Sequence, residues 1–78
     1  MAYTIWGIAL GEVGRYAEAC TKYAKATELD AGEWMAWVAW ATALARMGKR
    51  DEAEEKWRRA AELNPRLRAV TVQSSGEP

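Results

Sequence analysis

Residues 34–48, WMAWVAWATALARMG, carry the pattern that decides the fold. Four apolar residues in this stretch follow the i, i+3, i+4, i+7 spacing of one face of an amphipathic helix: Trp37, Trp40, Ala41 and Leu44. Gly48 comes next, where a glycine commonly ends a helix. The spacing therefore predicts a helix over residues 34–47.

A second apolar pattern follows this glycine, at Ala53, Trp57, Ala60, Ala61 and Leu63. It stops at Asn64-Pro65, because the residue before a proline avoids helical backbone angles. These signals predict a helix over residues 51–63. Acidic and basic residues four apart indicate a solvated face carrying ion pairs: Glu52–Lys56, Glu54–Arg58 and Glu55–Arg59.

The same pattern occurs twice. With an offset of 34, residues 1–33 align with residues 35–67 without a gap, and twelve of the 33 pairs are identical, among them Trp6/Trp40 and Gly14/Gly48. Repetition of this kind marks an array of identical structural units. It predicts helices over residues 2–13 and 16–29, a first repeat over 1–33 and a second over 34–67.

The period and the spacing together resemble the tetratricopeptide repeat, whose signature is Trp-x2-Leu-Gly-x2-Tyr, then Ala-x3-Phe, then Pro. The second copy matches as Trp37-x2-Trp40-Ala41-x2-Leu44, Ala53-x3-Trp57 and Pro65. The first matches as Tyr3-x2-Trp6-Gly7-x2-Leu10 and Ala19-x3-Tyr23, with Ala31 where proline is usual. The resemblance covers residues 1–67. It implies an all-α fold in which two antiparallel helix-turn-helix repeats stack as a short right-handed α-solenoid.

A third copy does not continue the pattern. In register, Thr71 and Ser74 stand where Trp37 and Trp40 stood, and neither can fill a core position. The polar end of the chain has the composition of a disordered segment. We expect residues 68–78 to form a partial cap followed by a disordered tail.

The aromatic residues of the first helix in each copy are expected to pack in the core. They are Tyr3, Trp6, Trp37 and Trp40. Trp34 differs, because its equivalent one repeat later is Arg68 and arginine is almost never buried unpaired. Trp34 is predicted either to anchor an interface, where tryptophan is enriched, or to cover the turn between the repeats.

The resemblance also implies a binding surface. In this family the first helix of each pair lines a concave face that holds protein partners. That face would carry Thr4, Ile5, Ile8, Glu12, Met35, Val38, Ala39, Thr42 and Arg46. The family's best-known ligand mode clamps a C-terminal carboxylate with Lys and Asn, and neither occurs in residues 1–12 or 34–46. We therefore expect an apolar groove that accepts a hydrophobic peptide, a partner helix or another copy of the chain.

Composition argues against other classes of function. The net charge is zero, which gives no basic field for nucleic acid, and the apolar run from Trp34 to Leu44 is too short to cross a membrane. The chain has no His and one Cys, so we expect no metal, no cofactor and no enzyme activity. The lone Cys20 favours a reducing compartment and hence a cytoplasmic location. Its thiol is either reactive or a small half-buried apolar group.

Two functions remain. The first is an adaptor that holds a protein partner in its groove, in this chain or in a longer array of which it is the C-terminal piece. The second is a self-assembling subunit that forms a dimer, ring or filament by end-to-end stacking. Two repeats fall below the roughly three that a stable solenoid usually needs. We therefore expect self-association at high concentration, with Trp34 near a contact.

Overall fold

The computed structural model describes residues 2–67, and this part of the chain contains four helices and no strand. They are α1 (Ala2–Glu12), α2 (Tyr16–Leu29), α3 (Trp34–Arg46) and α4 (Arg50–Leu63). The all-α prediction is confirmed, and each helix end lies within one residue of its expected place. The cap and tail predicted for residues 68–78 lie outside the described residues.

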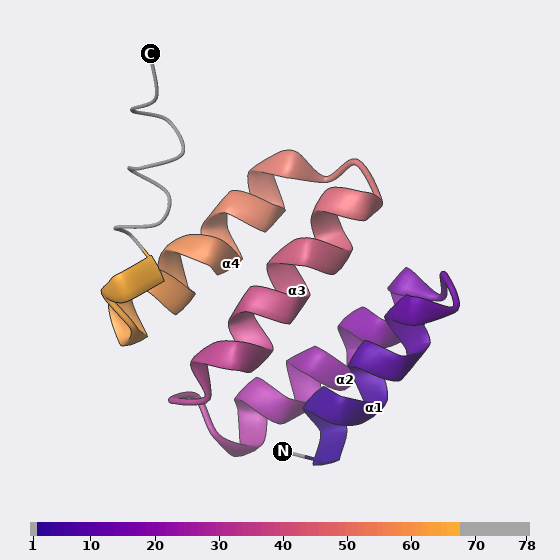
Figure 1. Cartoon of the computed structure of the whole chain (residues 1–78), viewed down its shortest axis with the longest axis horizontal. Coiled ribbons are helices and arrows are strands. Elements are labelled where there is room, and N and C mark those ends of the chain that lie inside the picture. Colours follow the sequence, from indigo (N-terminus) through magenta and orange to yellow (C-terminus); the bar gives the residue numbers. More distant parts are fainter. Residues whose placement is uncertain (1, 68–78) are drawn as a thin grey trace.

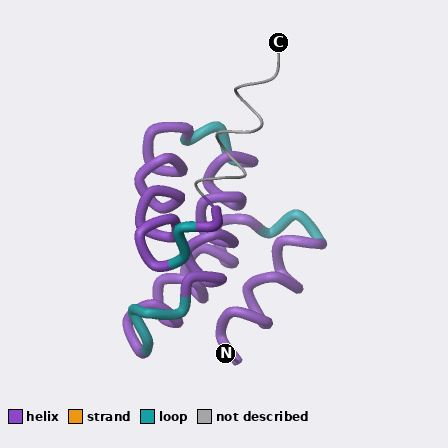
Figure 2. The backbone as a smooth tube through the Cα atoms, turned by 60° about the vertical axis from the view of Figure 1, so that its left-hand side comes forward, coloured by secondary structure: helices purple, strands orange, loops and turns teal. Residues whose placement is uncertain are grey.

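The helices form two hairpins that lie side by side. In Figure 1, α4, α3 and the α1–α2 pair follow one another across the molecule, and Figure 2 shows short loops joining successive helices. Helix α2 packs against α3, whereas α1 touches α3 only slightly. The contact between the two repeats is therefore made mainly by α2 and α3.

Both first helices end in the same hydrogen-bonded motif. The amide of Arg15 donates to the Leu10 carbonyl (2.9 Å), and the amide of Lys49 donates to the Leu44 carbonyl (2.9 Å). The glycines between, Gly14 and Gly48, have φ of 85° and 81°, the left-handed conformation that this Schellman cap requires. The cap ends α1 and α3 one residue earlier than the apolar spacing predicted.

The ends of the second helices are also alike. Asp30 and Asn64 stand at equivalent positions of the two repeats, and both are extended C-caps. The Asp30 side chain accepts a hydrogen bond from the Gly32 amide (3.0 Å), as Asn64 does from the Arg66 amide (3.2 Å). These Asx turns close both helices in the same way, although only the second is followed by proline.

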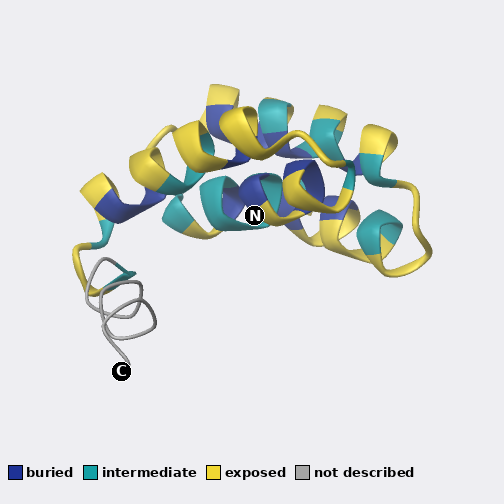
Figure 3. Ribbon diagram, turned by 90° about the horizontal axis from the view of Figure 1, so that it is seen from above, coloured by how far each residue is buried: buried dark blue, intermediate teal, exposed yellow. Residues whose placement is uncertain are grey.

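The core consists mainly of small side chains, and Figure 3 shows the buried residues on the inward sides of the helices. Most of the buried apolar residues are alanines: Ala19, Ala26, Ala36, Ala41, Ala43, Ala53, Ala60 and Ala61, joined by Tyr23 and Leu44. Alanine at the contacts lets helix axes approach closely. Among the described residues, no large side chain is completely enclosed.

The expectation of aromatic core residues is wrong for Trp6, which is 51% exposed. Tyr3, Trp37 and Trp40 are half-buried. The rings stack in pairs instead. The ring centroids of Tyr3 and Trp6 are 6.1 Å apart, with an interplanar angle of 18°. Those of Trp37 and Trp40 are 5.6 Å apart, with an angle of 20°. Small alanine side chains, and not these four rings, fill most of the buried positions.

A lysine from the second helix lies over each ring pair. The Nζ of Lys22 lies 3.9 Å from the Trp6 ring centroid, and the Nζ of Lys56 lies 4.3 Å from that of Trp40. Lys22 and Lys56 are equivalent residues of the two repeats, so each hairpin has the same cation–π contact between its two helices. Such contacts stabilise exposed sites by about 0.5–1 kcal/mol.

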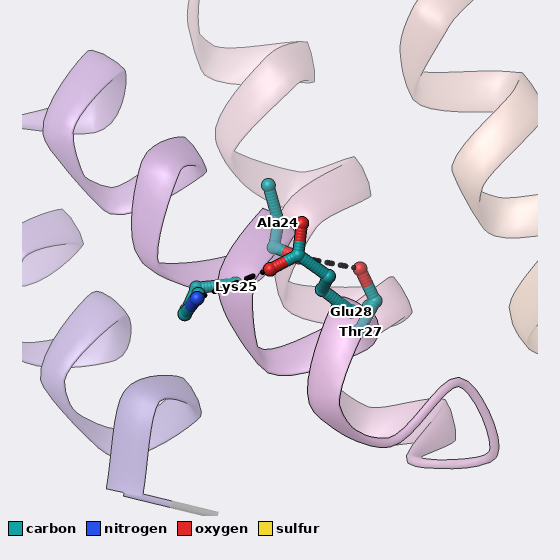
Figure 4. Close-up of polar contacts among 4 residues, drawn as sticks. All are labelled: Ala24, Lys25, Thr27 and Glu28. Atoms are coloured by element: carbon teal, nitrogen blue, oxygen red, sulfur yellow. Dashed lines mark hydrogen bonds and ion pairs between the residues drawn. The ribbon is translucent and has the colours of Figure 1, made fainter.

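The ion pairs expected four residues apart on α4 are not among those that its described residues form. Instead, Nζ of Lys56 lies 3.9 Å from Oε1 of Glu55, and Nη1 of Arg59 lies 3.2 Å from Oε1 of Glu62. Figure 4 shows a similar pair on α2, where Lys25 donates to Glu28 (3.1 Å) and Thr27 donates to the Ala24 carbonyl (3.0 Å). Exposed pairs of this kind contribute little to stability.

One aromatic residue enters the core fully. Tyr23 is 3% exposed and packs with Ala19 and Ala43. Its ring lies directly against the α1 backbone at Gly7, where an added Cβ would be 2.5 Å from Cε1 of Tyr23. Tyr23 can occupy this position only because residue 7 has no side chain.

We predict that Gly7→Ala lowers the free energy of unfolding by about 1–2 kcal/mol, since overpacking outweighs the gain in helix propensity. Gly11→Ala is the matched control. Its added Cβ would meet only the Tyr23 hydroxyl, at 3.9 Å, so it should stabilise α1 by about 0.5–1 kcal/mol. Urea unfolding followed by circular dichroism measures both. Equal stabilisation by the two substitutions would show that Tyr23 does not pack on Gly7.

Candidate functional site

An open groove of about 470 Å³ lies between α1, α2 and α3. Its wall is formed by Ile8, Gly11, Glu12, Tyr16, Tyr23, Ala39, Thr42, Ala43 and Arg46. The α1–α2–α3 groove follows directly from the repeat contact, because α3 packs on α2 and leaves a space toward α1.

Half of the predicted binding residues line this groove, namely Ile8, Glu12, Ala39, Thr42 and Arg46. The other five lie elsewhere. Ile5 and Met35 are exposed but do not line it, and Val38 and Trp34 are half-buried outside it.

Thr4, another of the predicted binding residues, is buried and hydrogen-bonded within the fold. It is 2% exposed, and its hydroxyl donates to Oε2 of Glu33 at 2.7 Å. This hydrogen bond ties α1 to the residue that precedes α3. The Thr4 hydroxyl is therefore used within the fold.

Two tyrosines of α2 line the groove although the sequence pointed only to the first helices. Tyr16 opens α2, and Tyr23 reaches the groove past Gly11. A signal for Tyr23 was present, because its position is a core position of the repeat and it stands opposite Gly7. The sequence offered no comparable signal for Tyr16, whose equivalent in the second repeat is Arg50.

The groove carries one acidic and one basic side chain at equivalent positions. Glu12 in the first repeat corresponds to Arg46 in the second, and both are exposed. Neither forms an ion pair with any other residue of 2–67. Both charges are therefore available to a bound molecule.

Burial raises the pKa of the Tyr23 hydroxyl, and the nearby Cys20 raises it further. The phenol accordingly stays protonated at neutral pH. At the groove wall it can donate a hydrogen bond to a ligand carbonyl or carboxylate.

Cys20 packs beside the same core cluster and is half-buried. Burial raises the pKa of its thiol, and Glu52 also raises it, while Lys49 opposes both. A raised pKa disfavours the thiolate, which is the reactive form. The geometry thus favours the small half-buried apolar group over the reactive thiol.

Residues 2–67 contain no cluster of three or more His, Cys, Asp or Glu side chains that could hold a metal ion. Over the same residues, no helix is long and apolar enough to cross a membrane. The chemistry of the groove is accordingly that of apolar contact, one cation, one anion and phenol hydrogen bonds.

Residues 34–67 match the family model described as a tetratricopeptide repeat. The match spans the second hairpin, α3 and α4, and confirms the resemblance over these residues. No curated protein matches the chain.

We predict that Cys20 reacts slowly with iodoacetamide at neutral pH in the folded chain, with a rate profile whose midpoint lies above the ordinary thiol pKa of 9.0. The chain unfolded in urea is the control and should show the ordinary midpoint. The pKa of the Cys20 thiol is higher in the folded chain than in the unfolded chain. Its contribution to the free energy of unfolding is therefore fully present below the unfolded pKa and is lost as pH rises through the folded pKa. A folded chain that reacts as fast as the unfolded chain at pH 7 would contradict this assignment.

Proposed function

Because residues 34–67 belong to the tetratricopeptide repeat family of protein–protein interaction modules, we propose that the α1–α2–α3 groove binds a segment of a protein partner. The observation that carries this proposal is the groove itself. It is open, its lining is mostly apolar, and its two charged side chains form no ion pair with residues 2–67.

The groove chemistry suggests the kind of segment that fits. Ile8 of α1 and Ala39 of α3 offer apolar contact. Arg46 can pair with a carboxylate through two parallel hydrogen bonds, and Glu12 can pair with a basic side chain. A peptide or helix with an apolar residue between an acidic and a basic one satisfies all of these groups.

This proposal treats residues 1–33 as a first repeat of the same kind. Identity at twelve of 33 aligned positions and the shared Schellman cap and Asx turn support it. The residues of the groove suit binding better than catalysis, since they include no nucleophile beside a general base. A reducing compartment such as the cytoplasm suits the single thiol.

Self-association, the second function expected from the sequence, has its own supporting observation on a different surface. Helix α1 exposes a large apolar side chain on its outer face, Ile5 at 62%, and Val13 just beyond the helix is 71% exposed. Large apolar side chains left in water lower the free energy of the chain when another copy covers them.

Selection of peptides from a random-sequence library on the immobilised chain tests the groove. We expect the selected peptides to combine an apolar residue with charges of both signs. Their affinity should fall about tenfold or more for Ile8→Asp and for Arg46→Ala, each of which removes a contact worth roughly 1.4 kcal/mol or more. Isothermal calorimetry gives the affinities, and circular dichroism verifies folding.

Two control variants lie outside the groove. Ala17→Glu changes an exposed residue of α2 whose equivalent, Asp51, is already acidic. Ile5→Glu changes an exposed residue of α1 that does not line the groove. Both should bind selected peptides normally. Peptides that bind Ile8→Asp and Arg46→Ala as tightly as the native chain would overturn the groove as the site.

A further inference from the structure

The contact between the two hairpins provides a template for a second contact. Three residues of α3, namely Ala39, Trp40 and Ala43, pack with Ala19 and Tyr23 of α2. Ala43 is 3% exposed and Ala36, on the same helix, is completely buried. This side of α3 is covered because the first hairpin lies against it.

The equivalent side of α1 is uncovered. In the first repeat, the positions of Ala39, Trp40 and Ala43 are held by Ile5, Trp6 and Ala9, which we call the α1 ridge. All three are exposed, Ile5 at 62% and Trp6 at 51%. The α1 ridge thus repeats the contact positions of α3, but no hairpin among residues 2–67 lies over it as the first hairpin lies over α3.

The surface that would receive such a ridge also recurs. An open groove of about 290 Å³, the α3–α4 groove, is lined by Ala41, Thr42, Ala45, Arg50, Ala53, Glu54 and Trp57. Four of these residues are the repeat equivalents of residues in the first groove, pairing as Thr42 with Ile8, Ala45 with Gly11, Arg50 with Tyr16 and Trp57 with Tyr23. Ala53, in the same groove, is the equivalent of Ala19.

We propose that copies of this chain associate head to tail, with the α1 ridge of one copy seated in the α3–α4 groove of the next. The incoming α1 would lie against α4 as α3 lies against α2, with Ala41 and Trp57 at the positions that Gly7 and Tyr23 hold in the first hairpin. The inference deepens the proposed self-association and is independent of peptide binding in the α1–α2–α3 groove.

Charge supports a second copy as the occupant. Within one chain, Glu12 of α1 and Arg46 of α3 line opposite walls of one groove. In the head-to-tail contact, Arg46 of the receiving copy stands at the position equivalent to Glu12. Glu12 of the incoming copy stands at the position equivalent to Arg46. One acidic and one basic side chain thus line the groove again, and these positions do not carry like charges.

The geometry is heterologous, because the ridge and the groove are different surfaces of the same chain. A heterologous contact leaves one free ridge and one free groove at the ends of any open stack, so growth need not stop at a dimer. In such a stack, α1 of each added copy would form the third wall of a further groove, beside α3 and α4 of the copy before it. This groove would be the equivalent of the α1–α2–α3 groove within one chain.

Sedimentation velocity of the 78-residue chain from micromolar to millimolar concentration tests the association. We expect the mean mass to rise continuously past that of a dimer. Ile5→Glu on the ridge and Ala45→Glu in the groove should each weaken association at least about tenfold. Both positions are exposed, so the folded monomer should tolerate the charge. Ala17→Glu, the matched exposed control on α2, should associate like the native chain.

Mixing the two variants distinguishes this contact from a symmetric one. Ile5→Glu retains a working groove and Ala45→Glu retains a working ridge. Their mixture should therefore form one-to-one dimers with nearly native affinity and grow no further. Circular dichroism of each variant establishes that it is folded before mixing.

A native chain that is monomeric at millimolar concentration would overturn the inference. So would a mixture of the two variants that stays monomeric, or a native chain that stops at a dimer. The peptide-binding measurements are made on Ile5→Glu, in which the α1–α2–α3 groove is intact. Loss of the head-to-tail contact and loss of groove binding are thus detected separately.

Discussion

The packing of the Tyr23 ring on the bare backbone of Gly7 is the contact on which the arrangement of the first three helices depends. A methyl group at residue 7 would lie within 3.0 Å of three atoms of the ring. With the ring in this position, Tyr23 fills the space that Ala19 and Ala43 leave between α2 and α3. The second hairpin uses Ala41 and Trp57 at the equivalent positions, and Trp57 is only half-buried. Ala41 carries a methyl group where Gly7 has none, so the bare backbone on which Tyr23 packs in α1 is not repeated in α3.

A core built from alanine determines where the large rings go. With alanines at most of the buried positions, Trp6, Trp37 and Trp40 are left partly exposed, stacked on aromatic neighbours and lying under the lysines of the second helices. A lysine in such a place covers ring surface with its methylene groups while keeping its ammonium in water. The half-exposed rings are therefore part of the link between the two helices of each hairpin, and they also leave apolar surface available to another molecule.

The two grooves are successive versions of one feature. Each lies beside a pair of helices from one repeat, and the first gains its third wall from α3. The opposite charges at Glu12 and Arg46 mean that the first groove presents an anion from one repeat and a cation from the other. A repeat protein with identical residues at these positions would present two like charges. The departure from exact repetition thus gives the groove its polarity and makes head-to-tail contact electrostatically favourable.

Local patterns in the sequence determined the four helices, the two repeats and the places where the chain turns. Apolar spacing marks the helices, and Gly14, Gly48, Asp30 and Asn64 act through the conformation of their own residues and immediate neighbours. For this reason their effect can be inferred without knowledge of the fold. The sequence also identified five of the residues that line the groove, Ile8, Glu12, Ala39, Thr42 and Arg46, through the family resemblance.

Only the tertiary structure decided which apolar residues are buried. Trp6 and Ala43 both stand on apolar helix faces, yet one is half exposed and the other is enclosed. Burial depends on the distance between helix axes, which alanine contacts and the Gly7–Tyr23 packing set across the molecule. The fold also placed Thr4 in a part-buried hydrogen bond with Glu33 and brought Tyr16 and Tyr23 to the groove. Periodicity specifies which face of a helix is apolar, but the neighbouring helix determines which part of that face is covered.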